Sequence, residues 1–363
     1  MYFFSFFHQL LWRVRYRRMF DRKLNILVTG AKGQLGSYLV DYFRKKSFLK
    51  KSRIGKVFGI DVEDLDIRDS SKVADFFNKN VVDPPIDIDY VIHCAAATNT
   101  AAIEKDPESY YAANCLGPRN IARSCAHNGI KMIFISTDYV LSERSPIFGT
   151  KIYEFPVNQY GLQKLIAEQF VKEAYRDKPN DYMVLRSSWM FGNSENSFVE
   201  KFLKNVFETY VAKTRKNDEK SKVEVSVADD AFGRPTPVWF IADTIDSLML
   251  IGSHGTLDLQ YPCPQISRYE WATMIWRAFV DTDLGTDSKT CQVVDDLKDA
   301  IEIVHKHSKD IGIQMHHPGK VGDDTVSSDL ATRDVIEVDT VEYVKRNWHK
   351  YATLANEMIA NRV

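Results

Sequence analysis

The sequence lacks an excess of charge of either sign, a paired-cysteine motif and a long apolar run. Its 48 basic and 49 acidic residues leave a formal net charge of -1, which provides no electrostatic footprint for nucleic acid. Its five cysteines are an odd number, and they form neither a Cys-x-x-Cys pair nor a zinc-finger spacing. We therefore expect no nucleic-acid partner, and a reducing, cytoplasmic setting.

A metal-ligand pattern is also absent. The late histidines His305, His307, His316 and His317 have no carboxylate or cysteine at a ligand spacing beside them. We predict that they are surface residues and that the protein holds no metal.

Residues 1–22 start with aromatic side chains and continue with arginines, and no acidic residue precedes Asp21. The apolar part is roughly a dozen residues long, short of the ~20 that cross a bilayer as a helix. We predict no membrane span, and the lack of a small-residue cleavage site argues against secretion. The segment is expected to be a disordered extension. An amphipathic membrane-surface or organelle-targeting segment is the alternative.

From residue 24 onward, short β-branched runs alternate with helical stretches. The runs are NILVTG, KVFGIDV, IDYVIHCAAA, KMIFIST and YMVLRSSW. This rhythm predicts an α/β fold of Rossmann type, a doubly wound parallel sheet whose apolar strands are buried on both faces. We place this core at residues 23–192. The rhythm then changes, and we place a smaller mixed α/β lobe, partly interleaved with the core, at residues 193–363.

The string TGAKGQLG, residues 29–36, follows the first strand and opens a helix, as a dinucleotide-binding turn requires. Gly30 allows the tight turn, Gly33 lets backbone N–H groups approach a pyrophosphate, and Gly36 lets the helix pack closely on the strand. Asp61 ends the next strand, where a carboxylate can accept hydrogen bonds from the adenosine ribose. That carboxylate favours NADH, whereas Lys32 in the turn can admit NADPH, so both cofactors stay open.

A second constellation follows the glycine turn in chain order. The small residues Ala95, Ala96 and Ala97 leave room for a cofactor at a strand end. Thr137 ends a later strand. Tyr160 and Lys164 lie one turn apart at the start of a helix, so a hydroxyl, a phenol and an ammonium can converge. A phenol can exchange a proton with a carbonyl oxygen, provided that a nearby cation lowers its pKa from about 10.

These strings resemble the extended short-chain dehydrogenase/reductases and, among them, the dTDP-4-dehydrorhamnose reductase family, over roughly residues 24–279. Beside TGAKGQLG, the resemblance rests on the segment 99–120 and on ISTDYV, YGLQKLIAE, RSSWMFG and DDAFGRPTP. It implies that Thr137, Tyr160 and Lys164 form the catalytic triad and that Trp189 lines a sugar pocket. It also implies a nucleotide-sugar substrate and, because family members often dimerise, a homodimer.

The expected site has a cofactor part and a substrate part. The expected cofactor-binding residues are Gly30, Lys32, Gly33, Gln34, Leu35, Gly36, Asp61, Ala95, Ala96, Ala97, Tyr160 and Lys164, to which the resemblance adds Asp66 and Ile67. The expected substrate-binding residues are Thr137 and Asp138, to which the resemblance adds Trp189, Asn196, Phe198 and Arg234. Residues 23–192 would then hold NADPH or NADH, and residues 193–363 would bind the substrate.

The resemblance also distinguishes a reductase from a related class of enzyme, the sugar-nucleotide 4,6-dehydratases. Sugar-nucleotide 4,6-dehydratases carry an Asp-Glu pair after the threonine, whereas Asp138 and Tyr139 follow Thr137 here, which argues against a dehydratase. The last third departs from the family pattern, with His-His-Pro-Gly at 316–319 and an added helical stretch expected at 293–313.

The expected activity is reduction of the 4-keto group of a 4-keto-6-deoxy-hexose carried by dTDP or UDP. A rival is a non-catalytic regulatory subunit, because the resemblance extends to the β subunit of methionine adenosyltransferase. A combined epimerase and reductase would need a further acid/base pair that the sequence does not reveal.

Overall fold

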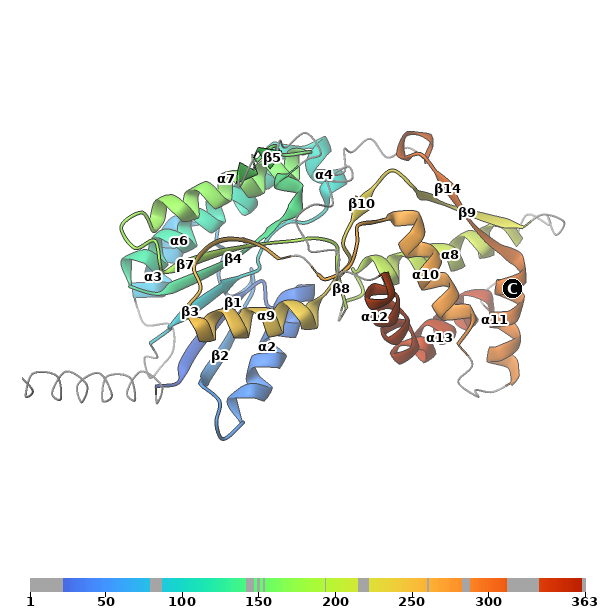
Figure 1. Cartoon of the computed structure of the whole chain (residues 1–363), viewed down its shortest axis with the longest axis horizontal. Helices are drawn as coiled ribbons and strands as arrows, with labels where there is room; N and C mark the ends of the chain where they lie inside the picture. The colour runs from blue at the N-terminus through green and yellow to red at the C-terminus, as the bar shows by residue number, and fades with distance from the viewer. Residues whose placement is uncertain are drawn as a thin grey trace, which may run out of the picture.

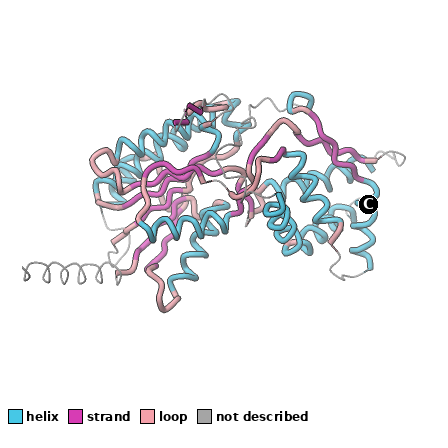
Figure 2. The backbone as a smooth tube through the Cα atoms, viewed as in Figure 1, coloured by secondary structure: helices cyan, strands magenta, loops and turns pink. Residues whose placement is uncertain are grey.

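The computed structural model describes residues 22–78, 87–141, 147–148, 151–152, 154–192, 194–214, 222–259, 261–282, 288–311 and 333–360. The N-terminal segment 1–21, most of the charged run at 213–222 and the departing strings after residue 311 lie outside these ranges. Figure 1 shows two lobes side by side, one built on the sheet around β1, β3 and β4, the other on helices α8 and α10 to α13. Figure 2 shows that helix dominates the second lobe.

The first lobe contains a six-stranded sheet in which all neighbouring strands are parallel. In spatial order the strands are β12 (Gly255–Asp258), β7 (Tyr182–Ser187), β4 (Lys131–Thr137), β3 (Tyr90–His93), β1 (Leu24–Thr29) and β2 (Ile54–Ile60). The four residues of β3 are all buried, as are the last six of β4. This confirms the predicted Rossmann-type parallel sheet.

Helices cover both faces of this sheet, which explains why its strands lack polar alternation. One face packs on α2 (Gln34–Ser47) and α9 (Val238–Ile251). The other packs on α3 (Ser70–Asn78), α6 (Gly117–His127) and α7 (Gln159–Ala174). Both α9 and β12 come from beyond residue 192, so the second half of the chain completes the sheet.

Short elements at the carboxyl ends of the strands shape the surface above the sheet. They are α4 (Thr100–Lys105), α5 (Pro107–Tyr111), the π-helical turn η1 (Ala112–Leu116), the 3-10 turn η2 (Asp138–Val140), β5 (Ile147–Phe148) and β6 (Lys151–Ile152). Two short ribbons connect the lobes: β8 (Met190–Phe191) pairs with β11 (Thr236–Pro237), and β10 (Phe232–Gly233) pairs with β13 (Ile266–Ser267).

The second lobe packs around buried aromatic side chains, of which Trp271 and Trp348 are the largest. Its elements are α8 (Phe198–Thr214), β9 (Val223–Ala228), α10 (Arg268–Val280), α11 (Ser288–Ala300), β14 (Ile301–Lys306), η3 (Ser308–Ile311), α12 (Arg333–Arg346) and α13 (Trp348–Ala360).

The helix expected over 293–313 is wrong beyond residue 300. The helix α11 ends at Ala300, and residues 301–306 form β14, which pairs in parallel with β9. The backbone hydrogen bonds offered by β9, almost eighty residues earlier, override the local helical pattern. Among the described residues no helix is both long and apolar enough to cross a bilayer.

Candidate active site

The glycine turn connects β1 to α2 and has the backbone that its glycines were expected to provide. Gly30 has φ +67°, and a Cβ on it would lie 2.7 Å from the backbone nitrogen of Ala95. A Cβ on Gly36 would overlap the carbonyl oxygen of Gly30. Gly33 is the N-cap of α2 and makes no side-chain cap. No N-cap side chain therefore competes for the first N–H groups of α2, as an anion site requires.

Two carboxylates lie beside this turn, and each is already hydrogen bonded. Asp61 accepts from the backbone N–H groups of Lys32 and Val62, both at 2.8 Å. Asp66 accepts two bonds of 2.8 Å from the Arg68 guanidinium, which holds the pKa of Asp66 down at about 2. The Lys32 ammonium pairs with Glu63 at 3.0 Å.

A cavity of about 470 Å³ opens along the turn. Eight of the expected cofactor-binding residues line it, namely Gly30, Lys32, Gly33, Asp61, Asp66, Ile67, Ala95 and Ala96. The others do not: Leu35 packs into the core, and Gln34, Gly36, Ala97, Tyr160 and Lys164 lie outside the lining. A larger cavity of about 610 Å³, at the opposite end of the sheet, includes none of the expected site residues.

Thr137, Tyr160 and Lys164 lie on neighbouring elements at the carboxyl end of the sheet. The Thr137 hydroxyl, at the end of β4, accepts from the backbone N–H of Tyr139 at 3.2 Å. The Tyr160 ring meets the Tyr139 ring edge-on, with centroids 6.2 Å apart. A Cβ on Gly161 would overlap the Tyr139 carbonyl oxygen, so this glycine lets α7 approach η2 closely. The sequence analysis gave Gly161 no role.

Burial is the main cause of the pKa shifts of Lys164, Tyr160 and Asp138. Lys164 is only 2% exposed, its Nζ lies 4.0 Å from the Phe134 ring centroid, and burial lowers its pKa to about 8. Burial raises the pKa of the Tyr160 phenol well above its usual value, with smaller contributions from Tyr139 and Asp138. Burial also raises the pKa of Asp138 to about 6. A buried phenol with a raised pKa stays protonated at neutral pH, and a cation placed beside it lowers that pKa.

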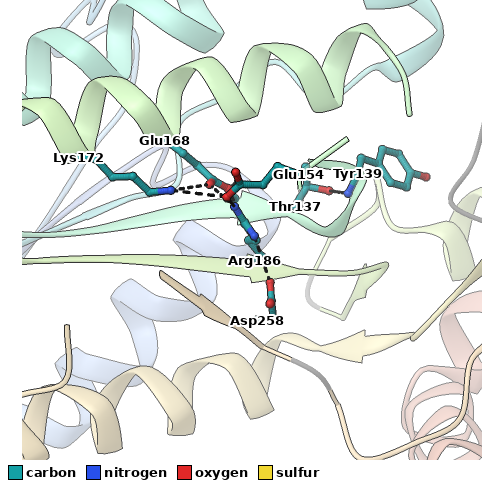
Figure 3. A network of polar contacts seen from close by, with 8 residues as sticks. Thr137, Tyr139, Glu154, Glu168, Lys172, Arg186 and Asp258 are labelled. Atoms are coloured by element: carbon teal, nitrogen blue, oxygen red, sulfur yellow. Dashed lines mark hydrogen bonds and ion pairs between the residues drawn. The ribbon is translucent and has the colours of Figure 1, made fainter. Parts of the chain in front are cut away.

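A buried ionic network fixes α7 against the sheet (Figure 3). Glu168, one turn after Lys164, accepts from the Ser136 hydroxyl at 2.6 Å and from the Arg186 guanidinium at 2.6 and 2.9 Å. Ser136 directly precedes Thr137 on β4, and Arg186 lies on β7. The network therefore ties the helix carrying Tyr160 and Lys164 to the strand carrying Thr137. Only the position of Glu168, an acid four residues after Lys164, marked it in the sequence.

Asn114 is a second buried support that the sequence analysis missed. It lies in the π-helical turn η1, fully buried, where its side chain accepts from the backbone N–H of Ala97 at 2.8 Å and donates to the Ala97 carbonyl at 3.1 Å. It also donates to the Gln163 side chain at 2.9 Å. Asn114 thus fixes the alanine segment beside the cavity to the helix of the candidate triad.

The expected substrate residues separate into two groups. Trp189, Phe198 and Asp138 surround one position: the Arg268 guanidinium lies 3.5 Å from the Trp189 ring centroid and 4.5 Å from that of Phe198, and its charge acts on Asp138. Arg234 is 5% exposed and donates to the Cys263 carbonyl, and the Asn196 side chain is exposed. Arg268 was not identified from the sequence, although Ser267-x-x-Glu270 is a capping box that places it first in a helix.

The described histidines near the end of β14 lie beside aspartate side chains at the surface. His305 lies 3.0 Å from Asp229 and His307 lies 3.2 Å from Asp230. Within the described ranges, no three His, Cys, Asp or Glu side chains are grouped so as to hold a metal ion. His316 and His317 are outside those ranges.

Comparison with known proteins gives consistent results. Residues 24–291 match the family model described as the RmlD substrate binding domain. The dTDP-4-dehydrorhamnose reductase of Mycolicibacterium smegmatis is 31% identical over 232 residues, which are 63% of this chain and 61% of that protein. The match thus spans about three fifths of that relative's length.

Solved structures extend the similarity to most of the chain. The dTDP-4-dehydrorhamnose reductase of Clostridium acetobutylicum is 25% identical with a TM-score of 0.63, and the match covers 89% of this chain and 99% of that one. The Bacillus anthracis dTDP-4-dehydrorhamnose reductase in complex with NADP is 26% identical with a TM-score of 0.60, covering 82% and 88%.

Proposed function

Because the chain belongs to the family of the RmlD substrate binding domain, we propose that it is an NADPH- or NADH-dependent reductase of a nucleotide-linked 4-keto-6-deoxy-hexose. The relatives named above are dTDP-4-dehydrorhamnose reductases. One observation carries the proposal: Tyr160 on α7 and Thr137 on β4 meet around η2, at the same sheet edge as the glycine-turn cavity. The nucleotide is dTDP or UDP.

The residues around the cavity fit a dinucleotide. A Cβ would fill the turn at Gly30 and at Gly36, and the start of α2 offers free N–H groups to a pyrophosphate. Asp61 and Asp66 would take the adenosine side of the cofactor, and Ala95 to Ala97 would leave space for its passage to Tyr160. When bound there, the cofactor supplies the hydride for carbonyl reduction.

The chain's own residues would then manage the carbonyl oxygen. Tyr160 keeps its proton because burial raises its pKa, so it is suited to donate that proton to the oxygen of a ketone that becomes an alkoxide. The Thr137 hydroxyl would orient the same oxygen. Lys164 would hold the cofactor ribose and, with the positive charge of the oxidised cofactor, return the Tyr160 pKa toward neutral values.

Spectrophotometry tests the proposal directly. We expect the purified protein to consume NADPH or NADH when given a dTDP- or UDP-4-keto-6-deoxy-hexose after 3,5-epimerisation. We expect Tyr160→Phe to lower turnover by about 10²- to 10⁴-fold, the usual contribution of a proton donor. Tyr111→Phe, which removes an exposed phenol on α5, should leave turnover unchanged. A wild-type protein that binds cofactor but turns over none of these sugars would favour the regulatory-subunit alternative.

The proposal includes the assembly and the setting. We expect a homodimer in the cytosol, with a nucleotide sugar as its ligand and no nucleic acid. Light scattering on the purified protein measures the oligomer, and a mass corresponding to one chain would contradict the dimer.

A further inference from the structure

Arg268 lies on the substrate side of the site, at a position that the backbone fixes firmly. It is the first residue of α10, directly after the N-cap Ser267, whose capping box with Glu270 is complete. Its own N–H donates to the carbonyl of Ala231 at 2.9 Å. The strand before it, β13, pairs with Gly233 in β10, and a Cβ on Gly233 would overlap the Trp189 indole. The guanidinium is therefore anchored beside Trp189.

The Arg268 guanidinium covers the indole that was expected to line the sugar pocket. Trp189 is 8% exposed, with Trp271 stacked on it at 5.8 Å between centroids and Arg268 at 3.5 Å from its ring centroid. Phe198 lies 4.5 Å from the same guanidinium. Planar guanidinium groups stack on aromatic faces in this way and keep their N–H donors free at the edge. The guanidinium therefore covers one face of the Trp189 indole.

The edge of this guanidinium includes a buried nitrogen, Nη1, without an acceptor in the described part of the chain. Its polar neighbours are the Tyr139 phenol and the Asp138 carboxylate, and desolvation by burial lowers the pKa of Arg268 to about 10. Among the described residues, no acceptor bonds to the buried Nη1 atom. A buried donor without an acceptor is costly, so an oxygen atom supplied by a ligand would be favoured at this point.

We propose that Arg268 binds the sugar of the substrate, with its guanidinium donating to a sugar oxygen while Asp138 accepts from a neighbouring hydroxyl. The inference rests on the proposed function and names the residue pair that recognises the hexose. Arg268 acts as a substrate-binding residue, and Trp189 supports it from behind.

The charges at this point favour a sugar over the diphosphate. Asp138 is ionised above its pKa of about 6, and its negative charge faces Arg268. A diphosphate placed here would be repelled by that carboxylate, whereas hydroxyl groups can both donate to Asp138 and accept from Arg268. Asp138 is also bonded to Thr137 at 3.2 Å, so the recognised sugar lies next to the candidate triad.

Calorimetry with two ligands tests the inference without turnover. The ligands are dTDP and dTDP-rhamnose, which differ only by the hexose, and the proteins are the wild type, Arg268→Met and Arg268→Lys. We expect Arg268→Met to weaken dTDP-rhamnose by about 10- to 100-fold, as for a lost charge-assisted hydrogen bond. Its affinity for dTDP should stay within about twofold of the wild type. Lysine, a point charge without the planar fork, should restore binding only in part.

The control is Arg277→Met, which removes an exposed arginine from the same helix and should change neither affinity. Equal losses for dTDP and dTDP-rhamnose would place Arg268 at the diphosphate and overturn the inference, as would no loss for either ligand. A wild type that binds neither ligand would instead contradict the proposed function, and the inference with it.

Discussion

Lys164 is held in a position that is costly for the folded protein. Its ammonium is almost completely buried, and the carboxylate that acts on it, Glu168, is itself hydrogen bonded to Arg186. The charged form is therefore disfavoured in the folded state, since its pKa falls from 10.5 to about 8. Strain of this kind is common where a side chain is placed for chemistry instead of stability.

Replacing Lys164 by methionine should therefore stabilise the cofactor-free protein. The pKa shift corresponds to a penalty on the order of 3 kcal/mol, fully present below pH 8 and lost as the pH rises toward 10.5. We expect Lys164→Met to raise the free energy of unfolding at pH 7 by about 1–3 kcal/mol, with a smaller gain at pH 10. Urea unfolding at the two pH values measures this difference, with Lys56→Met, which removes an exposed lysine of β2, as the control.

A mutant that is less stable than the wild type at pH 7 would contradict this account of Lys164. A gain that grows between pH 7 and pH 10 would contradict it as well, because the sign of the linkage would then be reversed.

How well the sequence predicted individual residues depends on how local their role is. Gly30 and Gly36 are required by their own turn, so their spacing alone indicated the geometry that the structure shows. Arg268 and Asn114 act through partners 79 and 17 residues away, at Trp189 and Ala97 respectively. Nothing in the neighbouring sequence of either residue indicates those partners, so only the structure could identify them.

At the scale of elements, the seating of α2 on β1 decides whether a pyrophosphate can be held. Gly36 brings the first turn of α2 against the carbonyl of Gly30, so that the first N–H groups of the helix follow directly after Gly33, which lines the cavity. Tilting the helix away by the width of a methyl group would move these donors out of hydrogen-bonding range.

We therefore expect Gly36→Ala to weaken dinucleotide binding by at least about 10-fold and to cost about 1–3 kcal/mol of stability through overpacking. Gly129→Ala is the matched control: Gly129 has φ +69° but no atom within 4 Å of an added Cβ. It should cost about 1 kcal/mol and leave cofactor affinity unchanged. Fluorescence titration with NADPH and NADH measures the affinities, and equal affinities in both variants would contradict the role given to Gly36.

The strands also show which elements the local sequence pattern can predict and which it cannot. The strands of the parallel sheet could be predicted because burial on both faces demands unbroken apolar runs. The strand β14 was predicted as helix because its identity depends on pairing with β9. The family expected from the sequence was confirmed by the family model, which ends at residue 291, before this strand begins.

At the scale of the whole molecule, the two lobes contribute different parts of the candidate site. The sheet lobe supplies the glycine turn, Thr137, Tyr160 and Lys164, while α8 and α10 bring Phe198 and Arg268 to the same region (Figure 1). The crossing of the chain back into the sheet through α9 and β12 ties the lobes together. Reduction by this chain would require both lobes, because neither contains the full set of residues.

The central claim is that this chain transfers hydride from the cofactor to C4 of the sugar, and transfer of deuterium tests it most directly. The protein is incubated with NADPH or NADH carrying deuterium at both hydrogen positions of nicotinamide C4 and with the nucleotide-linked 4-keto-6-deoxy-hexose, and the product is analysed by mass spectrometry and NMR. The account predicts one deuterium at C4 of the hexose, incorporated about 10²- to 10⁴-fold more slowly with Tyr160→Phe. A bound cofactor and a bound sugar without deuterium at C4 would contradict it.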